Sequence, residues 1–112
     1  MSTSRFAFLP FALVTVSMLA VAGCGGTTKT DGASIFMNSG CGVCHTLTAA
    51  NARGKSARNL DQSKFTEAQM VTQITNGGKV MQPFKGRLTT QQIATVAAYV
   101  AKSRDEVAAG KQ

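Results

Sequence analysis

The clearest helical pattern lies in the last quarter of the chain. Apolar residues recur there at i, i+3, i+4 and i+7, the spacing of one helix face: Ile93, Val96, Ala97 and Val100. The sequence Thr-Thr-Gln-Gln at 89–92 precedes them and has the form of a capping box, which predicts that a helix begins there. From about residue 104 the chain is polar and rich in small residues, so residues 105–112 are predicted to form a frayed tail.

Two shorter helices are predicted before this one. Thr-Glu-Ala-Gln at 66–69 is a second capping box, and its helix should stop at the Asn-Gly-Gly of residues 76–78. The apolar stripe of that helix comprises Met70, Val71 and Ile74. Asp31 is a suitable N-cap for a first helix from Gly32 to about Gly40, whose apolar ridge comprises Ile35 and Phe36.

The segments between these helices lack a sustained period. Residues 46–62 and 79–88 are therefore predicted to be irregular loops, with Leu47 and Leu60 as the inward residues of the first. Because no run of strands is visible, the predicted fold class is all-α, with three to four short helices. Long irregular loops are uncommon in a small domain unless they serve a function, and here they are expected to cover a cofactor.

The N-terminal segment is predicted to be a signal peptide. Residues 6–22 are apolar apart from Thr15 and Ser17, but Pro10 interrupts them and the run is too short to cross a bilayer. The sequence Val-Ala-Gly-Cys at 21–24 resembles the lipobox of bacterial lipoproteins. Residues 1–23 would then be removed, and Cys24 would carry a diacylglycerol that anchors the protein to a membrane. The alternative is an ordinary signal peptide cut nearby.

Length and charge narrow the possible roles. The chain has 112 residues, which allows one domain, and a net charge of +7. Residues 24–31 are predicted to form a flexible tether, and residues 32–104 are predicted to form the folded domain. No interleaving of aromatic and basic residues indicates nucleic-acid binding. We expect the positive charge to steer the protein toward acidic docking surfaces or anionic lipid headgroups, unless it serves solubility alone.

The sequence Cys-Gly-Val-Cys-His at 41–45 carries the main candidate chemistry. C-x-x-C-H is the motif of c-type haem attachment. Residues three and four apart share a helix face, so Cys41, Cys44 and His45 can present two thiols and an imidazole to one haem. A dithiol redox site would need a thioredoxin-like βαβ setting, and a structural zinc site would lack a fourth ligand.

A second axial ligand is expected from a methionine. Met37 lies too close to the motif to reach the opposite haem face, and Met70 lies in an amphipathic helix where methionine commonly fills the core. Met81 lies in a loop bounded by Gly and Pro, so it is the preferred candidate, with Lys79 or an open site as alternatives. Ligation by His and Met raises the haem potential.

With these motifs, the chain resembles the class I c-type cytochromes over residues 32–101. The resemblance rests on residues 41–45, 76–88 and 92–100. It implies a small cytochrome c fold around one covalent haem c, with the first and last helices crossing where Gly32, Phe36 and Tyr99 lie. It also implies a one-electron carrier and no enzyme, with redox proteins as partners and no small-molecule substrate.

Two positions depart from the family pattern. Many members have Gly-Pro-Asn-Leu after the haem motif, and the Pro carbonyl accepts a hydrogen bond from the proximal histidine. This chain has Ala-Arg-Asn-Leu at 57–60, which puts the acceptor at Arg58 in question. Many members also have Pro directly after the ligand methionine, whereas here Gln82 precedes Pro83, which predicts a looser loop.

The function expected from sequence is an electron carrier anchored to the outer face of the cytoplasmic membrane, in a respiratory or photosynthetic chain. Two alternatives stay open. One is a five-coordinate haem enzyme or gas sensor. The other is a haem relay subunit of a larger oxidase or dehydrogenase.

Overall fold

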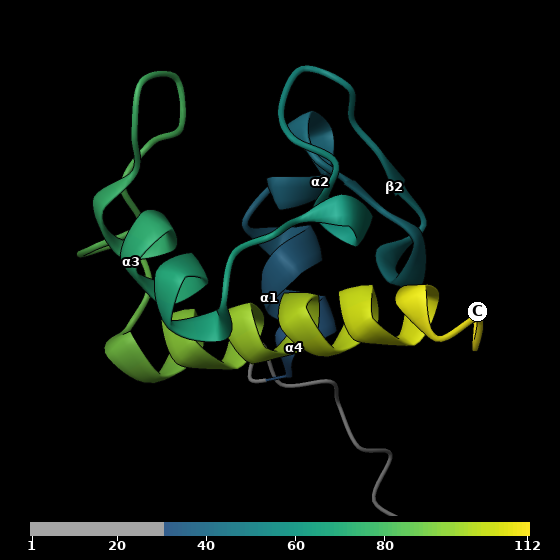
Figure 1. Cartoon of the computed structure of the whole chain (residues 1–112). Helices are drawn as coiled ribbons and strands as arrows, with labels where there is room; N and C mark the ends of the chain where they lie inside the picture. The colour runs from purple at the N-terminus through teal and green to yellow at the C-terminus, as the bar shows by residue number, and fades with distance from the viewer. Residues whose placement is uncertain (1–30) are drawn as a thin grey trace, which may run out of the picture.

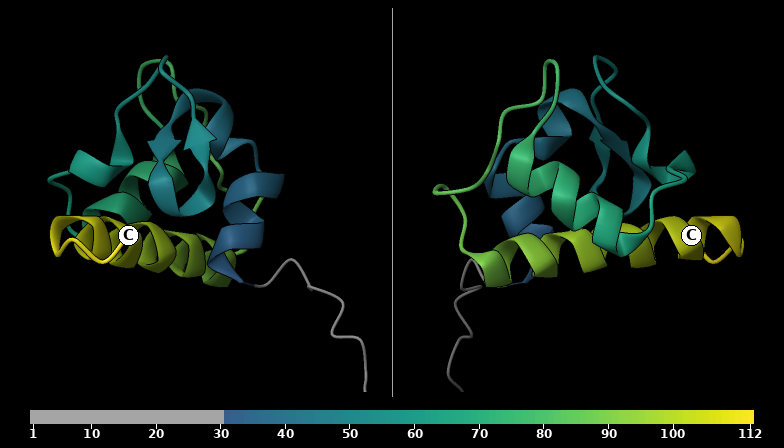
Figure 2. Two further views of the ribbon diagram at one scale, coloured as in Figure 1. Left: turned by 90° about the vertical axis from the view of Figure 1, so that its right-hand side faces the viewer. Right: turned by 60° about the vertical axis from the view of Figure 1, so that its left-hand side comes forward.

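The computed structural model describes residues 31–112, in which four α-helices surround a small core. They are α1 (Gly32–Asn38), α2 (Cys41–Cys44), α3 (Glu67–Asn76) and α4 (Thr90–Ala108). Helix α4 forms the base of the molecule, and α1 and α3 both pack against it. Two loops rise on the side opposite α4 (Figures 1 and 2).

The helix starts predicted from the capping patterns are confirmed. Thr66 and Gln69 cap α3 reciprocally: the Thr66 N–H donates to Gln69 Oε1 at 2.8 Å, and the Gln69 N–H donates to Thr66 Oγ1 at 3.2 Å. Thr89 and Gln92 form the same pair at the start of α4. Each such cap is worth about 1 kcal/mol, which matters in a domain this small.

The core lies where α1 and α3 meet α4, and it contains the predicted apolar stripes. Ile35, Phe36, Met70, Val96, Ala97 and Val100 are all buried. The predicted crossing is also present, since the rings of Phe36 and Tyr99 lie edge to face at 6.2 Å. Gly32 permits this contact, because a Cβ at that position would collide with Tyr99 Cβ and lie 2.9 Å from the Thr95 carbonyl oxygen.

The segment 46–62 is more ordered than predicted. Strands β1 (Thr46–Leu47) and β2 (Ala52–Arg53) pair antiparallel, joined by a 3₁₀ turn at Thr48–Ala50. Asn51 makes the tight reversal possible with φ of 49°. Leu47 is fully buried as expected, and Leu60 packs partly buried against the core in a second 3₁₀ turn, Leu60–Gln62. Two-residue strands are too short to give a period in the sequence.

The predicted ends of the first and last helices are wrong. Helix α1 stops at Asn38 because Gly40 adopts a left-handed conformation, with φ of 75°, and α2 starts directly after it. Helix α4 continues to Ala108, so most of residues 105–112 is helix and not a frayed tail. Arg104 explains the extension, since its guanidinium donates to the Phe65 carbonyl and pairs with Asp105.

The predicted signal peptide (1–23), the lipid site at Cys24 and all but the last residue of the tether lie outside the described residues. Within residues 31–112, none of the helices is both long enough and apolar enough to cross a membrane.

Candidate functional site

A cavity of about 500 Å³ lies between the two raised loops, beside α2. It is lined by all four residues that the sequence analysis selected for one site: Cys41, Cys44, His45 and Met81. The first three come from α2 and its C-cap, and Met81 comes from the loop after α3. Figure 1 shows α2 and the loop after α3 on the same side of α4.

Helix α2 is a single turn whose geometry presents both thiols. Cys41 and Cys44 are free cysteines, and the His45 N–H closes the turn by donating to the Cys41 carbonyl at 3.0 Å. Gly42 faces away from the cavity, where a Cβ would lie 2.9 Å from Ala52 Cβ. The small residue between the two cysteines therefore lets α2 pack directly on β2.

The loop after β2 is fastened to the end of the motif and to Thr46 by three hydrogen bonds. The Ala57 N–H donates to the Cys44 carbonyl at 3.0 Å, and Thr46 Oγ1 donates to the Gly54 carbonyl at 2.8 Å. His45 Nδ1 lies 2.8 Å from the Arg58 carbonyl oxygen, which can only accept, so Nδ1 carries the proton. The acceptor that the sequence left in question is therefore present, and Nε2 keeps a free lone pair.

Met81 is held in a tight hairpin. Its N–H donates to the Gly78 carbonyl at 2.7 Å, and the Gly78 N–H donates back to the Met81 carbonyl at 2.9 Å. Lys79 takes a positive φ of 41° in this turn. The Met81 sulfur lies 3.9 Å from Nε2 of Gln73, a donor on α3.

The other methionines of the described chain are elsewhere. Met70 is buried in the core and Met37 is 56 % exposed, and neither lines the cavity. Their positions agree with the roles that sequence analysis gave them.

The Cys41 thiol is not tuned for dithiol exchange. Burial raises the pKa of the Cys41 thiol, and the neighbouring Cys44 raises it slightly further. Dithiol redox sites need the opposite shift, because the thiolate is the reacting species. A hollow lined by two thiols, one imidazole and one thioether sulfur instead fits a haem that would be attached at the two thiols and held by the imidazole and the thioether.

Two residues near the cavity, Gln73 and Phe84, were missed by the sequence analysis, and Arg87 was expected only to orient redox partners by its charge. Gln73 contacts the Met81 sulfur, Phe84 is buried beside the cavity, and Arg87 lies 5.0 Å above the Phe84 ring. Arg87 also donates to the Gln82 side chain at 3.1 Å. The Met81 loop is therefore braced although Gln82 stands where many relatives have proline. The contact between Gln73 and Met81 forms only because α3 lies against the loop, whereas the contacts of Arg87 lie within the loop.

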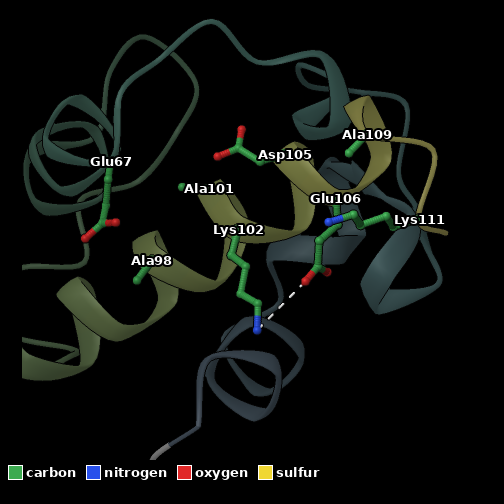
Figure 3. Close-up of a pocket in the computed structure, with 8 residues that line it drawn as sticks. All are labelled: Glu67, Ala98, Ala101, Lys102, Asp105, Glu106, Ala109 and Lys111. Atoms are coloured by element: carbon green, nitrogen blue, oxygen red, sulfur yellow. Dashed lines mark ion pairs between the residues drawn. The ribbon is translucent and has the colours of Figure 1, made fainter.

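Charge is distributed unevenly over the molecule. Residues 53–60 and 79–88, which both contribute to the cavity lining, contain six cations and no carboxylate: Arg53, Lys55, Arg58, Lys79, Lys85 and Arg87. The carboxylates gather elsewhere, since Glu67, Asp105 and Glu106 line a second depression between α3 and α4 (Figure 3). There Lys102 pairs with Glu106 at 3.8 Å. The two segments that contribute to the first cavity are thus net positive, and Arg87 lines the cavity itself.

Comparison with known proteins identifies the family. The family model described as "Cytochrome C oxidase, cbb3-type, subunit III" matches residues 27–100. Cytochrome c6 of a Nostoc species is 37% identical over 79 residues, which cover 67% of this chain and 70% of that protein. Cytochrome c6 of Leptolyngbya boryana is 38% identical over 74 residues, covering 62% and 85%. The chain belongs to the class I c-type cytochromes.

Solved structures agree with this assignment. The crystal structure of the c-type cytochrome SorU from Sinorhizobium meliloti is similar to this cytochrome with a TM-score of 0.61 at 36% identity. The match covers 65% of this chain and 86% of that one. The predicted small cytochrome c fold is therefore confirmed, and so is the single covalent haem c. This cytochrome is an extracytoplasmic electron carrier and not an enzyme.

Proposed function

We propose that this cytochrome carries single electrons on a haem c attached through Cys41 and Cys44, with His45 and Met81 as axial ligands. One observation carries the proposal: these four side chains line the same cavity, although Met81 is far from the motif in sequence. When bound, the haem supplies an iron that cycles between the ferrous and ferric states.

The protein residues have distinct tasks in this mechanism. The thiols of Cys41 and Cys44 form the two thioether bonds, which makes the cofactor permanent. The hydrogen bond from His45 Nδ1 to Arg58 orients the ring and leaves Nε2 as the donor to iron. Met81, which lines the cavity from the opposite loop, would supply the second iron ligand through its thioether sulfur. A thioether and an imidazole together favour a high reduction potential.

Mass spectrometry of the mature holoprotein tests the attachment. The peptide containing residues 41–45 is expected to carry the mass of one haem and to resist iodoacetamide. A Cys44→Ser variant should retain one thioether at Cys41, and Ser39→Ala serves as a matched control beside the motif. Alkylation of both thiols in a coloured protein would contradict the proposed attachment.

We further propose that Cys24 is lipidated and tethers the protein to the outer face of the cytoplasmic membrane. The support is the sequence Val-Ala-Gly-Cys at 21–24 and the extracytoplasmic location of the family. A chain of eight residues spans about 15 Å as a coil, so the domain would stay near the membrane surface. Cys24→Ala should release the protein from the membrane fraction, and unchanged fractionation would refute the anchor.

The partners that fit this cytochrome are redox proteins with acidic docking surfaces. The support is the exclusively cationic charge of residues 53–60 and 79–88, both of which contribute to the cavity lining. Such charges orient an encounter and raise its rate, and salt screens them with a Debye length of about 8 Å at physiological ionic strength.

A second role has one specific observation in its favour. The matching family model describes subunit III of a cbb3-type oxidase, so this cytochrome could be a fixed haem relay of a larger complex. Mild detergent extraction followed by size-exclusion chromatography separates the two roles. A free carrier elutes as a monomer, and a relay subunit elutes with stoichiometric companions.

A further inference from the structure

Arg58 contacts its surroundings in two separate ways. Its backbone carbonyl accepts the hydrogen bond from His45 Nδ1 at 2.8 Å. Its guanidinium lies over the ring of Phe65, with Cζ 5.4 Å from the ring centroid, within the range of a cation–π contact. A single residue thus links the ring of His45 to an aromatic side chain beyond the loop.

Phe65 is itself held from several sides. Arg104 of α4 donates a hydrogen bond to the Phe65 carbonyl, across a separation of 39 residues. The Phe65 N–H donates to the hydroxyl of Ser63, a buried residue, at 3.3 Å. The Phe65 ring packs half-buried against the core. The ring is therefore a fixed surface, built by α4 and the core, on which the Arg58 side chain rests.

We propose that Arg58 is a positioning residue for His45: its stack on Phe65 holds its own carbonyl in place and so keeps the His45 Nδ1 hydrogen bond formed. The proposal rests on His45 being the proximal ligand. The neighbours of Arg58 are held by hydrogen bonds, Ala57 to the Cys44 carbonyl and Asn59 to the Asp61 N–H, but Arg58 is itself exposed, and its side chain is fixed by the contact with Phe65. A ring bonded at Nδ1 has a fixed orientation and a more basic Nε2.

The effect can be measured on the Nδ1 proton itself. Loss of an exposed cation–π contact of typical strength should raise the population of the state in which the His45–Arg58 hydrogen bond is broken by about two- to fivefold. NMR of the reduced holoprotein should therefore show the His45 Nδ1 proton exchanging with water about two to five times faster in Arg58→Gln and in Phe65→Leu. Arg58→Lys, which restores a cation, should return exchange toward the wild-type rate.

Lys55→Gln is the matched control, because it removes one positive charge from the same loop and has no aromatic partner. It should exchange at the wild-type rate. The double variant Arg58→Gln/Phe65→Leu should exchange no faster than the faster single variant, since both changes break one contact. Additive effects, or an equal effect from Lys55→Gln, would overturn the proposal.

The same samples separate this inference from the proposed function. A visible spectrum typical of low-spin haem c in every variant, with unaltered exchange in Arg58→Gln, would refute the positioning role alone. A wild-type protein without a His45-bound haem would refute the proposed function on which it rests.

Discussion

Gly77 provides the sharpest test of how the Met81 loop is held. It caps α3 with φ of 66° and ψ of −160°, a combination that is essentially limited to glycine. A Cβ there would collide with the Met81 carbonyl oxygen and lie 2.7 Å from the Pro83 nitrogen. Gly77→Ala therefore adds a collision with the loop to the cost of the conformation, which by itself is on the order of 1–3 kcal/mol.

Gly86→Ala separates the cost of the backbone conformation from the cost of the collision. Gly86 also has a positive φ, of 83°, but a Cβ there would meet nothing within 4 Å. Gly86→Ala should lower the free energy of unfolding by about 1–2 kcal/mol and leave Met81 bound. Gly77→Ala should cost more than this, and because the collision displaces the Met81 carbonyl, exogenous imidazole should replace Met81 at lower concentration.

The assay is a pair of titrations on each holoprotein. Denaturant unfolding followed by far-ultraviolet circular dichroism gives the free energy of unfolding, and imidazole binding followed in the visible spectrum reports the Met81 bond. Equal imidazole affinity in Gly77→Ala and Gly86→Ala would refute the reasoning, because it would mean that the loop absorbs the added methyl without moving Met81.

Three further predictions follow from other parts of the structure. Gly32→Ala should lower the free energy of unfolding by about 1–3 kcal/mol, because the added methyl pushes α1 away from Tyr99. An unchanged free energy in denaturant unfolding would mean that the two helices can separate without cost, and would contradict the prediction. The hydrogen bond from Ser34 lowers the pKa of the Asp31 carboxyl below its usual 3.8, so the ionised carboxylate stabilises the fold above pH 3.8 and this stabilisation is lost as pH falls through the pKa of the folded state. Asp31→Asn should therefore lack this loss of stability in acid unfolding curves. Identical curves for the variant and the wild type would contradict the prediction. Lys79→Gln combined with Lys85→Gln should slow electron transfer to an acidic redox protein at low salt and not at high salt, whereas a rate independent of ionic strength would remove charge steering from the mechanism.

The features predictable from sequence are those encoded locally. The capping boxes at Thr66 and Thr89 give the helix starts because their hydrogen bonds join residues three apart. The haem motif is likewise contained in one turn of helix. Met81 could be selected because its loop excludes it from a helical core stripe, unlike Met70.

The features that sequence analysis missed depend on contacts between distant segments. The end of α4 extends because Arg104 reaches Phe65, which is 39 residues away, and no local pattern encodes that hydrogen bond. The short hairpin of β1 and β2 depends on the left-handed conformation of Asn51. The sequence pattern of this segment does not show which residue adopts that conformation. Gln73 becomes visible as a contact of Met81 only when α3 and the loop are both in place.

Carbon monoxide binding to the reduced protein tests the central claim most directly. If Met81 closes the second axial position of a haem held by His45, the wild-type protein should bind carbon monoxide slowly and incompletely, while Met81→Ala binds it at once. The control Met37→Ala, which changes an exposed methionine outside the cavity, should behave as wild type. Rapid binding by the wild-type protein, or equal binding by Met81→Ala and wild type, would contradict the account.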